Sequence, residues 1–282
     1  MKRSMRDHFG ISDPYHQICR EERNLCALLY HLLLSSRENL IRLLELVDVP
    51  TKELSQPEIY VEYAHVRDIW SAFKSAEPQK VEEKNKRCRE FILENLGLEP
   101  SDILSKRCIY EFNRSFIFSS SEVSEKKRRK ISKTRIESPS NWSVKQIHAT
   151  FPRKNFSNDI FLRAVRFKWC FNVKPDIIIF LNDKNAISIE AKLKSSLGTY
   201  PSKSEEIAIF EERGIKVVSQ TDIQEQALKM LGIKAKHVIL ATSAKAGDSL
   251  TWGKVLAALD VSGESEFVKA QIESFKMLAN AG

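Results

Sequence analysis

The sequence has no apolar run of about 18 or more residues, which excludes a membrane-spanning helix and argues against a membrane partner. The basic N-terminus, residues 1–7, has no apolar stretch behind it, so we expect no secretory signal. The five cysteines stand far apart, without a Cys-x-x-Cys pair or a Cys/His cluster, which excludes a recognisable zinc site. Free thiols and a cytoplasmic location are therefore the expectation.

The composition is that of a folded and mildly basic protein. Hydrophobic residues make up 42% and aromatic residues 9%, which is enough apolar surface for a core and excludes a disordered chain. The 45 Lys and Arg residues outnumber the 37 Asp and Glu residues, and the net charge of +8 favours a polyanionic partner. Many soluble proteins are this basic, so the charge is informative only beside a site.

The predicted secondary structure changes near residue 140, from mostly helices to mixed strands and helices. Helical spacing of apolar residues predicts helices over 15–47, 57–75 and 78–96. A charged stretch over 119–135 has the composition of an exposed loop. Strands and helices then alternate, which predicts an α/β (α+β) fold. We expect a mostly helical region over 1–140, including a helix that packs on the core, and the core itself over 141–282.

The second half supplies the elements of that core. The pattern predicts a short helix over 158–165, a β-like segment over 166–171, strands over 175–181 and 186–193 joined by a turn at 182–185, a strand over 216–219, a helix over 221–231, a strand over 237–241 and a last helix over 264–279. Trp252 is expected in the core as a packing anchor.

The predicted hairpin carries the candidate chemistry. From 186 to 194 apolar and polar residues alternate, so Glu190 and Lys192 share one face of their strand. A three-residue loop over 183–185 would pair Ile178 with Glu190 and place Asp176 opposite Lys192 on that face. Asp176 and Glu190 would then be about 7–8 Å apart. Such a pair of carboxylates suits Mg²⁺, and a neighbouring lysine can orient water or stabilise phosphate charge.

These residues resemble the motif of the PD-(D/E)XK nucleases, the restriction-endonuclease-like superfamily. The motif reads Pro175-Asp176, thirteen intervening residues, and Glu190-Ala191-Lys192. The resemblance implies a mixed sheet flanked by helices, with Asp176 and Glu190 as metal ligands and Lys192 as the catalytic lysine. It covers roughly residues 158–260, together with the helix that contains Glu22.

Further residues are candidates by the same resemblance. An added acidic ligand often comes from a preceding helix, where Glu22 is favoured over Glu21, although an ordinary first-turn glutamate explains either residue. Gln220 or Gln224 could hold the site or the substrate, against the alternative of a solvated helix end. The basic residues expected to contact phosphates are Lys194, Lys126, Lys127, Arg128 and Arg129, against the alternative of solvated loops.

The sequence therefore predicts a Mg²⁺-dependent endonuclease, with Mn²⁺ able to substitute, that hydrolyses phosphodiester bonds in DNA. RNA as the substrate and a homodimer as the assembly are left open. A restriction or host-defence role is expected by analogy. The alternative is an inactive nucleic-acid-binding or assembly module on the same fold, which would not need Asp176 and Glu190 to converge on one ion.

Overall fold

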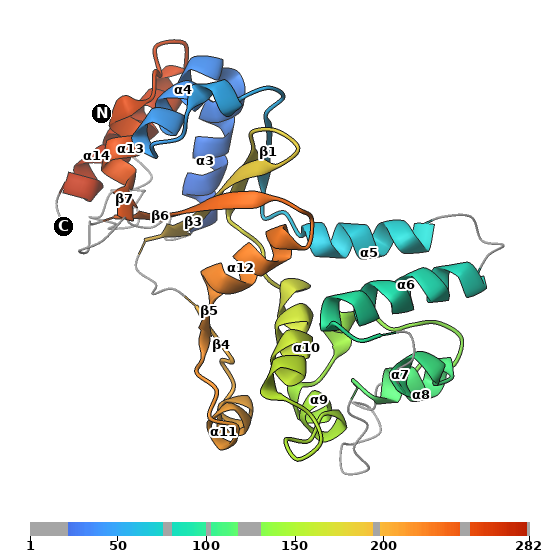
Figure 1. Cartoon of the computed structure of the whole chain (residues 1–282). Coiled ribbons are helices and arrows are strands. Elements are labelled where there is room, and N and C mark those ends of the chain that lie inside the picture. Colours follow the sequence, from blue (N-terminus) through green and yellow to red (C-terminus); the bar gives the residue numbers. More distant parts are fainter. Residues whose placement is uncertain are drawn as a thin grey trace, which may run out of the picture. The chain divides into compact units, whose positions relative to one another are not determined.

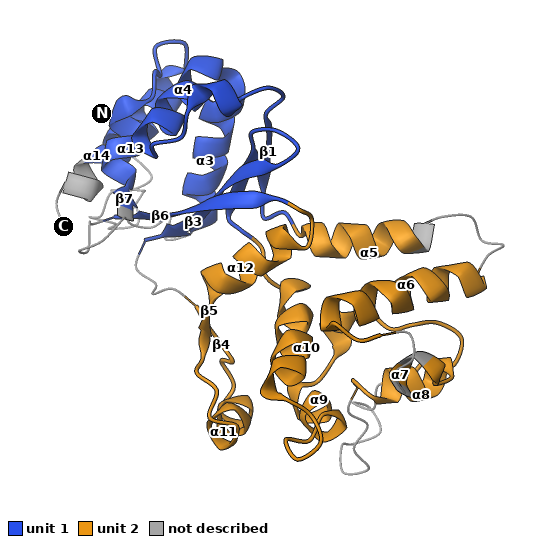
Figure 2. Cartoon of the chain, in the orientation of Figure 1, with its two compact units in different colours: residues 1–63, 175–197, 233–282 blue, residues 64–174, 198–232 orange. Residues whose placement is uncertain are grey.

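The computed structural model describes residues 22–75, 81–99, 103–117, 131–193, 198–242 and 249–280. The chain divides into two compact units, drawn in different colours in Figure 2. Unit 1 comprises Met1–Tyr63, Pro175–Leu197 and Ile233–Gly282, and unit 2 comprises Ala64–Lys174 and Gly198–Gly232. Both units are discontinuous in sequence, so this division differs from the expected single boundary near residue 140.

Unit 1 is built on a five-stranded mixed sheet (Figure 1). Its strands, in spatial order, are β1 (Glu58–Val61), β2 (Ile177–Phe180), β3 (Asn185–Lys192), β6 (Lys234–Ala241) and β7 (Ser249–Thr251). Neighbours are antiparallel from β1 to β3 and parallel from β3 to β7. The combination of this sheet with helices confirms the α/β class.

One face of the sheet carries the core of unit 1. Ile177 and Ile179 of β2, with Ile187 and Ile189 of β3, are almost completely buried on this face. They pack with side chains from the helices α3 (Glu22–Ser35), α4 (Arg37–Leu46), α13 (Trp252–Ala258) and α14 (Glu266–Asn280). The predicted alternation in β3 is confirmed, and Trp252 is buried in this core as expected.

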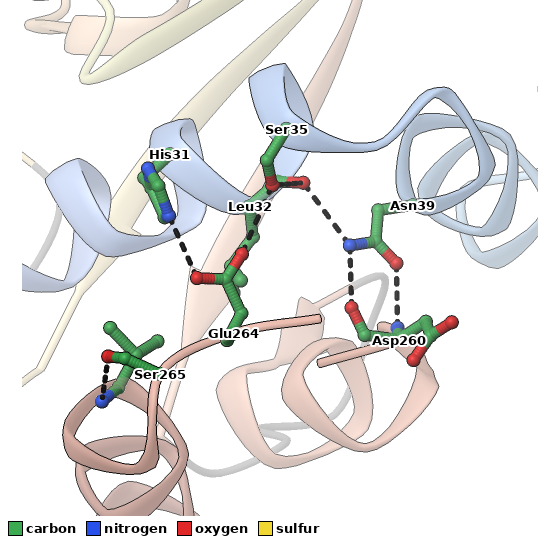
Figure 3. Close-up of polar contacts among 8 residues, drawn as sticks. His31, Leu32, Ser35, Asn39, Asp260, Glu264 and Ser265 are labelled. Carbon is green, nitrogen blue, oxygen red and sulfur yellow. Dashed lines mark hydrogen bonds and ion pairs between the residues drawn. The ribbon is translucent and has the colours of Figure 1, made fainter. Parts of the chain in front are cut away.

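Polar contacts join the end of α3 and the start of α4 to the segment between α13 and α14 (Figure 3). Asn39 is fully buried; its amide nitrogen donates to the Asp260 carbonyl at 2.9 Å, and its amide oxygen accepts from the Asp260 N–H at 2.6 Å. On α3, His31 Nε2 and Ser35 Oγ lie 3.0 and 3.2 Å from the Glu264 carboxylate oxygens. These contacts fix the end of α3 that lies away from Glu22.

Unit 2 is mostly helical. Its helices are α5 (His65–Ser75), α6 (Val81–Leu96), α7 (Ile103–Lys106), α8 (Ile109–Arg114), α9 (Val144–Thr150), α10 (Asn158–Cys170), α11 (Ser204–Glu212) and α12 (Gln220–Lys229), and a small sheet pairs β4 (Thr199–Tyr200) with β5 (Val218–Ser219). Its core is aromatic: the rings of Phe116 and Trp142 stack at 3.9 Å between centroids. The buried Arg213 guanidinium lies 3.9 Å from the Phe161 ring centroid.

Two predicted elements were wrong. Residues 58–61 lie inside the expected helix 57–75 but form strand β1, because their backbone pairs with β2 more than a hundred residues later. Residues 166–171 were expected to be β-like but continue α10 to Cys170. Their aromatic composition is typical of strands, yet Phe167 and Trp169 are both buried as helix residues in the core of unit 2.

In the part of the chain that the structure describes, none of the helices is long and apolar enough to cross a membrane.

Candidate active site

The hairpin of β2 and β3 sets the site. Ile178 pairs with Ser188, so the expected pairing of Ile178 with Glu190 was wrong by two residues. The reason lies in the turn, where Asn182 Oδ1 accepts hydrogen bonds from the N–H groups of Lys184 and Asn185 at 2.9 and 3.0 Å. The Leu181 N–H donates to the Asn185 carbonyl at 2.9 Å, so the loop consists of residues 182–184 and its centre lies one residue earlier than expected. The loop still has an odd length, so the faces of both strands are as expected.

The observed register brings the two motif carboxylates together on the face opposite the core. Ile177 pairs with Ile189, and continuing the register by one residue places Asp176 across from Glu190. Residues directly opposite each other in an antiparallel pair are nearer than the diagonal neighbours that the sequence predicted. Glu190 is only 2% exposed.

Asp176 is held at its backbone and at its side chain. Its carbonyl accepts from the Glu62 N–H at 3.0 Å, and its Oδ2 accepts from the Ala191 N–H at 2.8 Å. Burial and the negative charge of Glu190 raise the pKa of Asp176 to about 6, and the Ala191 N–H and the Lys192 charge offset only part of that rise. The protein therefore holds Asp176 in a partly buried place beside a second carboxylate, where its ionised form is disfavoured.

Lys192 lies between two carboxylates. Its Nζ is 2.7 Å from Glu190 Oε1 and 3.6 Å from Glu22 Oε2, and its side chain is 13% exposed. Burial disfavours the ammonium, but the hydrogen bond and charge of Glu190, with the charges of Glu22 and Asp176, outweigh that effect and raise the pKa of Lys192. Lys192 is therefore a cation at neutral pH.

Glu22 reaches this cluster from α3. It stands in the first turn of the helix, and its Oε1 accepts from the Leu193 N–H at 3.0 Å, just past the end of β3. The structure thus brings Glu22, Asp176, Glu190 and Lys192 together within unit 1. Glu21 lies outside the described residues.

Two residues near the site were not among the predicted site residues. Glu62 donates its N–H to the Asp176 carbonyl, and only the pairing of β1 with β2 reveals this contact. Cys26 is buried on α3, and burial, followed by the charges of Asp176, Glu22 and Glu190, raises the pKa of its thiol to about 12. The sequence did contain one indication that Cys26 lies near the site: it follows Glu22 by four residues on one helix, so both side chains lie on the same helix face.

The remaining candidates lie elsewhere. Gln220 is the first residue of α12 in unit 2, where its N–H donates to the Gly198 carbonyl at 2.8 Å. Gln224 is 1% exposed, and its amide donates to the Lys174 carbonyl at 3.3 Å, so the alternative of a solvated helix end is wrong for Gln224. Lys194 and the basic residues Lys126, Lys127, Arg128 and Arg129 lie outside the described residues.

The donors at the site are suited to a hard cation, although the described residues include no ready-made metal cage. No group of three or more His, Cys, Asp or Glu side chains is placed to hold a metal ion among the residues that the structure describes. Mg²⁺ does not need one, because it keeps several waters and binds through one or two carboxylates. Asp176 and Glu190 supply only oxygen donors, and the pKa of Asp176 is raised first by burial and then by the charge of Glu190, which a cation would neutralise.

No family model, no curated protein and no solved structure matches this chain. The geometry of unit 1 is therefore the basis on which a function is assigned.

Proposed function

We propose that unit 1 contains the active site of a metal-dependent nuclease that hydrolyses phosphodiester bonds in DNA. The observation that carries the proposal is the placement of Asp176 opposite Glu190, with the Lys192 ammonium 2.7 Å from Glu190. Phosphodiester hydrolysis needs charge neutralisation at the phosphate and an activated water, and these groups can supply both.

Each side chain has a distinct role in this proposal. Asp176 and Glu190 would hold Mg²⁺ or Mn²⁺, which when bound lowers the pKa of a coordinated water and neutralises phosphate charge. Lys192, kept cationic by its carboxylate neighbours, would stabilise the charge that develops on the phosphoryl oxygens. Glu22 would help to hold the Lys192 ammonium in place, with Oε2 at 3.6 Å from Nζ. The new bond joins the water oxygen to phosphorus, and the phosphorus–oxygen bond to the leaving strand breaks.

The topology supports a restriction-endonuclease-like core as the finer fold proposal. The antiparallel hairpin of β2 and β3 is followed in sequence by β4, α11 and β5, then by α12 and by β6, which lies parallel to β3. The PD-(D/E)XK resemblance implies such a mixed sheet with flanking helices. A restriction or host-defence role for such a nuclease belongs to the same proposal.

An inactive binding module is the competing proposal, and one observation favours it. The Lys192 ammonium already pairs with the buried Glu190 carboxylate, at 2.7 Å. An inactive module would use that ion pair as a permanent structural contact. The two proposals differ in whether a divalent cation changes the behaviour of the protein.

A cleavage assay separates them. The purified protein is incubated with Mg²⁺ or Mn²⁺ and with plasmid, linear duplex and single-stranded DNA, beside Glu190→Ala and Lys192→Ala. We expect each substitution to reduce cleavage by about 10²-fold or more, because each removes a preorganised charge. Lys192→Ala should also destabilise the fold, by up to about 3–5 kcal/mol, because it leaves the buried Glu190 carboxylate unpaired, so thermal melts of both variants identify any loss of cleavage that comes from unfolding.

Lys276 and Glu273 provide the matched control. They form an ion pair of 2.7 Å on α14 of the same unit. Replacing either with alanine should leave cleavage unchanged. Wild-type cutting in excess EDTA, or full activity of Glu190→Ala, would show that the hairpin is not the active site.

A further inference from the structure

Three aromatic side chains gather at the β1 edge of the unit 1 sheet. The rings of Tyr60 and Tyr63 are stacked, with centroids 4.6 Å apart and planes 20° apart. Phe180 meets both rings edge to face, at 6.0 Å from Tyr60 and 6.3 Å from Tyr63. All three residues are half-buried. We call Tyr60, Tyr63 and Phe180 the aromatic cluster.

The aromatic cluster lies beside the carboxylates. Tyr60 pairs with Ile178, so its side chain stands on the face of the sheet that carries Asp176. Glu62 lies two residues after Tyr60, just past the end of β1, and its N–H donates to the Asp176 carbonyl at 3.0 Å. Tyr60 and Asp176 are therefore diagonal neighbours on adjacent strands, at about 7–8 Å between their backbones. A nucleotide is long enough to cover both positions.

The surroundings of the aromatic cluster are polar and fix its geometry. The Tyr60 hydroxyl donates to Glu58 Oε2 at 2.5 Å, which restrains the ring. Arg23 Nε lies 2.7 Å from Glu62 Oε1, and the arginine side chain is 75% exposed. The arginine offsets the charge of Glu62 between the aromatic cluster and Asp176, so a phosphate is not repelled there by an unpaired carboxylate.

If the rings served packing alone, we would expect them to be more deeply buried. Aromatic pairs contribute about 0.5–1.5 kcal/mol beyond the area they bury, and most of their stabilisation comes from that burial. Here the rings remain half-buried at the edge of the sheet: Tyr60 lies on the edge strand β1, Tyr63 just beyond it, and Phe180 on β2. Aromatic rings that keep solvent contact beside a phosphate-cleaving site are the means by which proteins hold unpaired nucleobases.

We propose that the aromatic cluster is a stacking subsite for an unpaired nucleobase of the strand that is cut at Asp176 and Glu190. This inference rests on the proposed nuclease function and adds a substrate class to it. In a duplex each base face is covered by its neighbours, so only a single-stranded or frayed nucleotide can stack on Tyr60 or Tyr63. The preferred substrate is thus a single strand or the unpaired part of a branched DNA.

Binding is measured by fluorescence anisotropy with labelled single-stranded and duplex oligonucleotides of one sequence. All proteins carry Glu190→Gln, so that the DNA stays intact. Tyr60→Ala and Tyr63→Ala should each weaken single-strand binding about tenfold, while duplex binding changes little. Tyr60→Phe keeps the ring and should retain most of the affinity, which separates stacking from the bond to Glu58.

Phe267→Ala is the matched control, because Phe267 is 73% exposed on α14 and lies outside the aromatic cluster. It should bind both DNAs normally, and thermal melts identify any variant that fails to fold. Unchanged single-strand binding by both tyrosine variants, or an equal loss on duplex, would overturn the stacking subsite.

Cleavage by the protein with an intact Glu190 distinguishes the two proposals. Metal-dependent cutting combined with normal binding by the tyrosine variants would leave the nuclease and remove the subsite. Loss of single-strand binding by those variants, without cutting in Mg²⁺ or Mn²⁺, would keep the stacking and remove the nuclease.

Discussion

Replacing Asp176 by asparagine should stabilise the metal-free protein at neutral pH. The carboxyl of Asp176 has its pKa raised to about 6 by burial and by Glu190, so its ionised form is disfavoured in the folded state. Asparagine keeps an oxygen that can accept the Ala191 N–H bond and removes the negative charge. The variant therefore changes the electrostatics with little change in shape.

The magnitude follows from the rise of this pKa from 3.8 to about 6. For a fully buried group this corresponds to about 3 kcal/mol, and the partial solvent exposure of Asp176 reduces it to ~1–2 kcal/mol. Because the folded pKa is raised, the contribution to stability is fully present below the unfolded pKa and is lost as pH rises through about 6. The advantage of Asp176→Asn should thus grow between about pH 4 and about pH 7.

The assay is thermal unfolding in excess EDTA at several pH values, for the wild type and for Asp176→Asn. At about pH 7.5 the variant should melt about 2–6 °C higher, and the difference should shrink toward about pH 4.5. Mg²⁺ should then raise the melting temperature of the wild type and not that of the variant.

Asp260→Asn is the control for a generic effect of removing a carboxylate. The backbone N–H of Ser262 donates to Asp260 and lowers the pKa of its carboxyl, so neutralising this residue should bring no gain at neutral pH. Two outcomes would refute the argument that the folded protein disfavours the ionised form of Asp176. One is an Asp176→Asn variant no more stable than the wild type at about pH 7.5, and the other is a stability advantage that does not depend on pH.

Two further predictions concern Lys192 and the basic run. Lys192→Met removes the ammonium 2.7 Å from Glu190, so calorimetric titration should show Mn²⁺ binding about tenfold more tightly while cleavage is lost; weaker Mn²⁺ binding would contradict the competition between lysine and metal. Replacing Lys126, Lys127, Arg128 and Arg129 by alanine should weaken DNA binding on all sequences and flatten its dependence on salt, because such contacts read phosphates. An unchanged salt slope would assign these residues to solvent.

The hairpin could be predicted because its information is local. Strand alternation has a period of two, so Ile187 and Ile189 identify the core face, and Glu190 and Lys192 follow on the other. The register depended on the turn, since Asn182 closes a loop that lies one residue earlier in the chain than the one expected. An error of two residues preserves the faces, and for that reason the site residues still meet.

The rest of the sheet depends on contacts that no local pattern contains. Strand β1 was read as helix because residues 57–75 have apolar residues at helical spacing, yet its backbone hydrogen bonds come from β2. The aromatic cluster follows from the same pairing, because Tyr60 and Phe180 are brought together only when the two strands align. A sequence pattern gives the face of a side chain but not its neighbour on the next strand.

Glu22 joins the candidate site from a distant part of the sequence. Its carboxylate meets the Leu193 N–H across 171 positions of sequence, and its place depends on α3 packing on the core face of the sheet. The core itself needs no charge at Asp176, since Ile177 and Ile179 supply the buried surface of β2. A fold selected for stability alone would not keep a carboxyl with a raised pKa opposite Glu190. Departures of this kind from the folding rules gather at functional sites, and here the departure coincides with the residues from which we infer the chemistry.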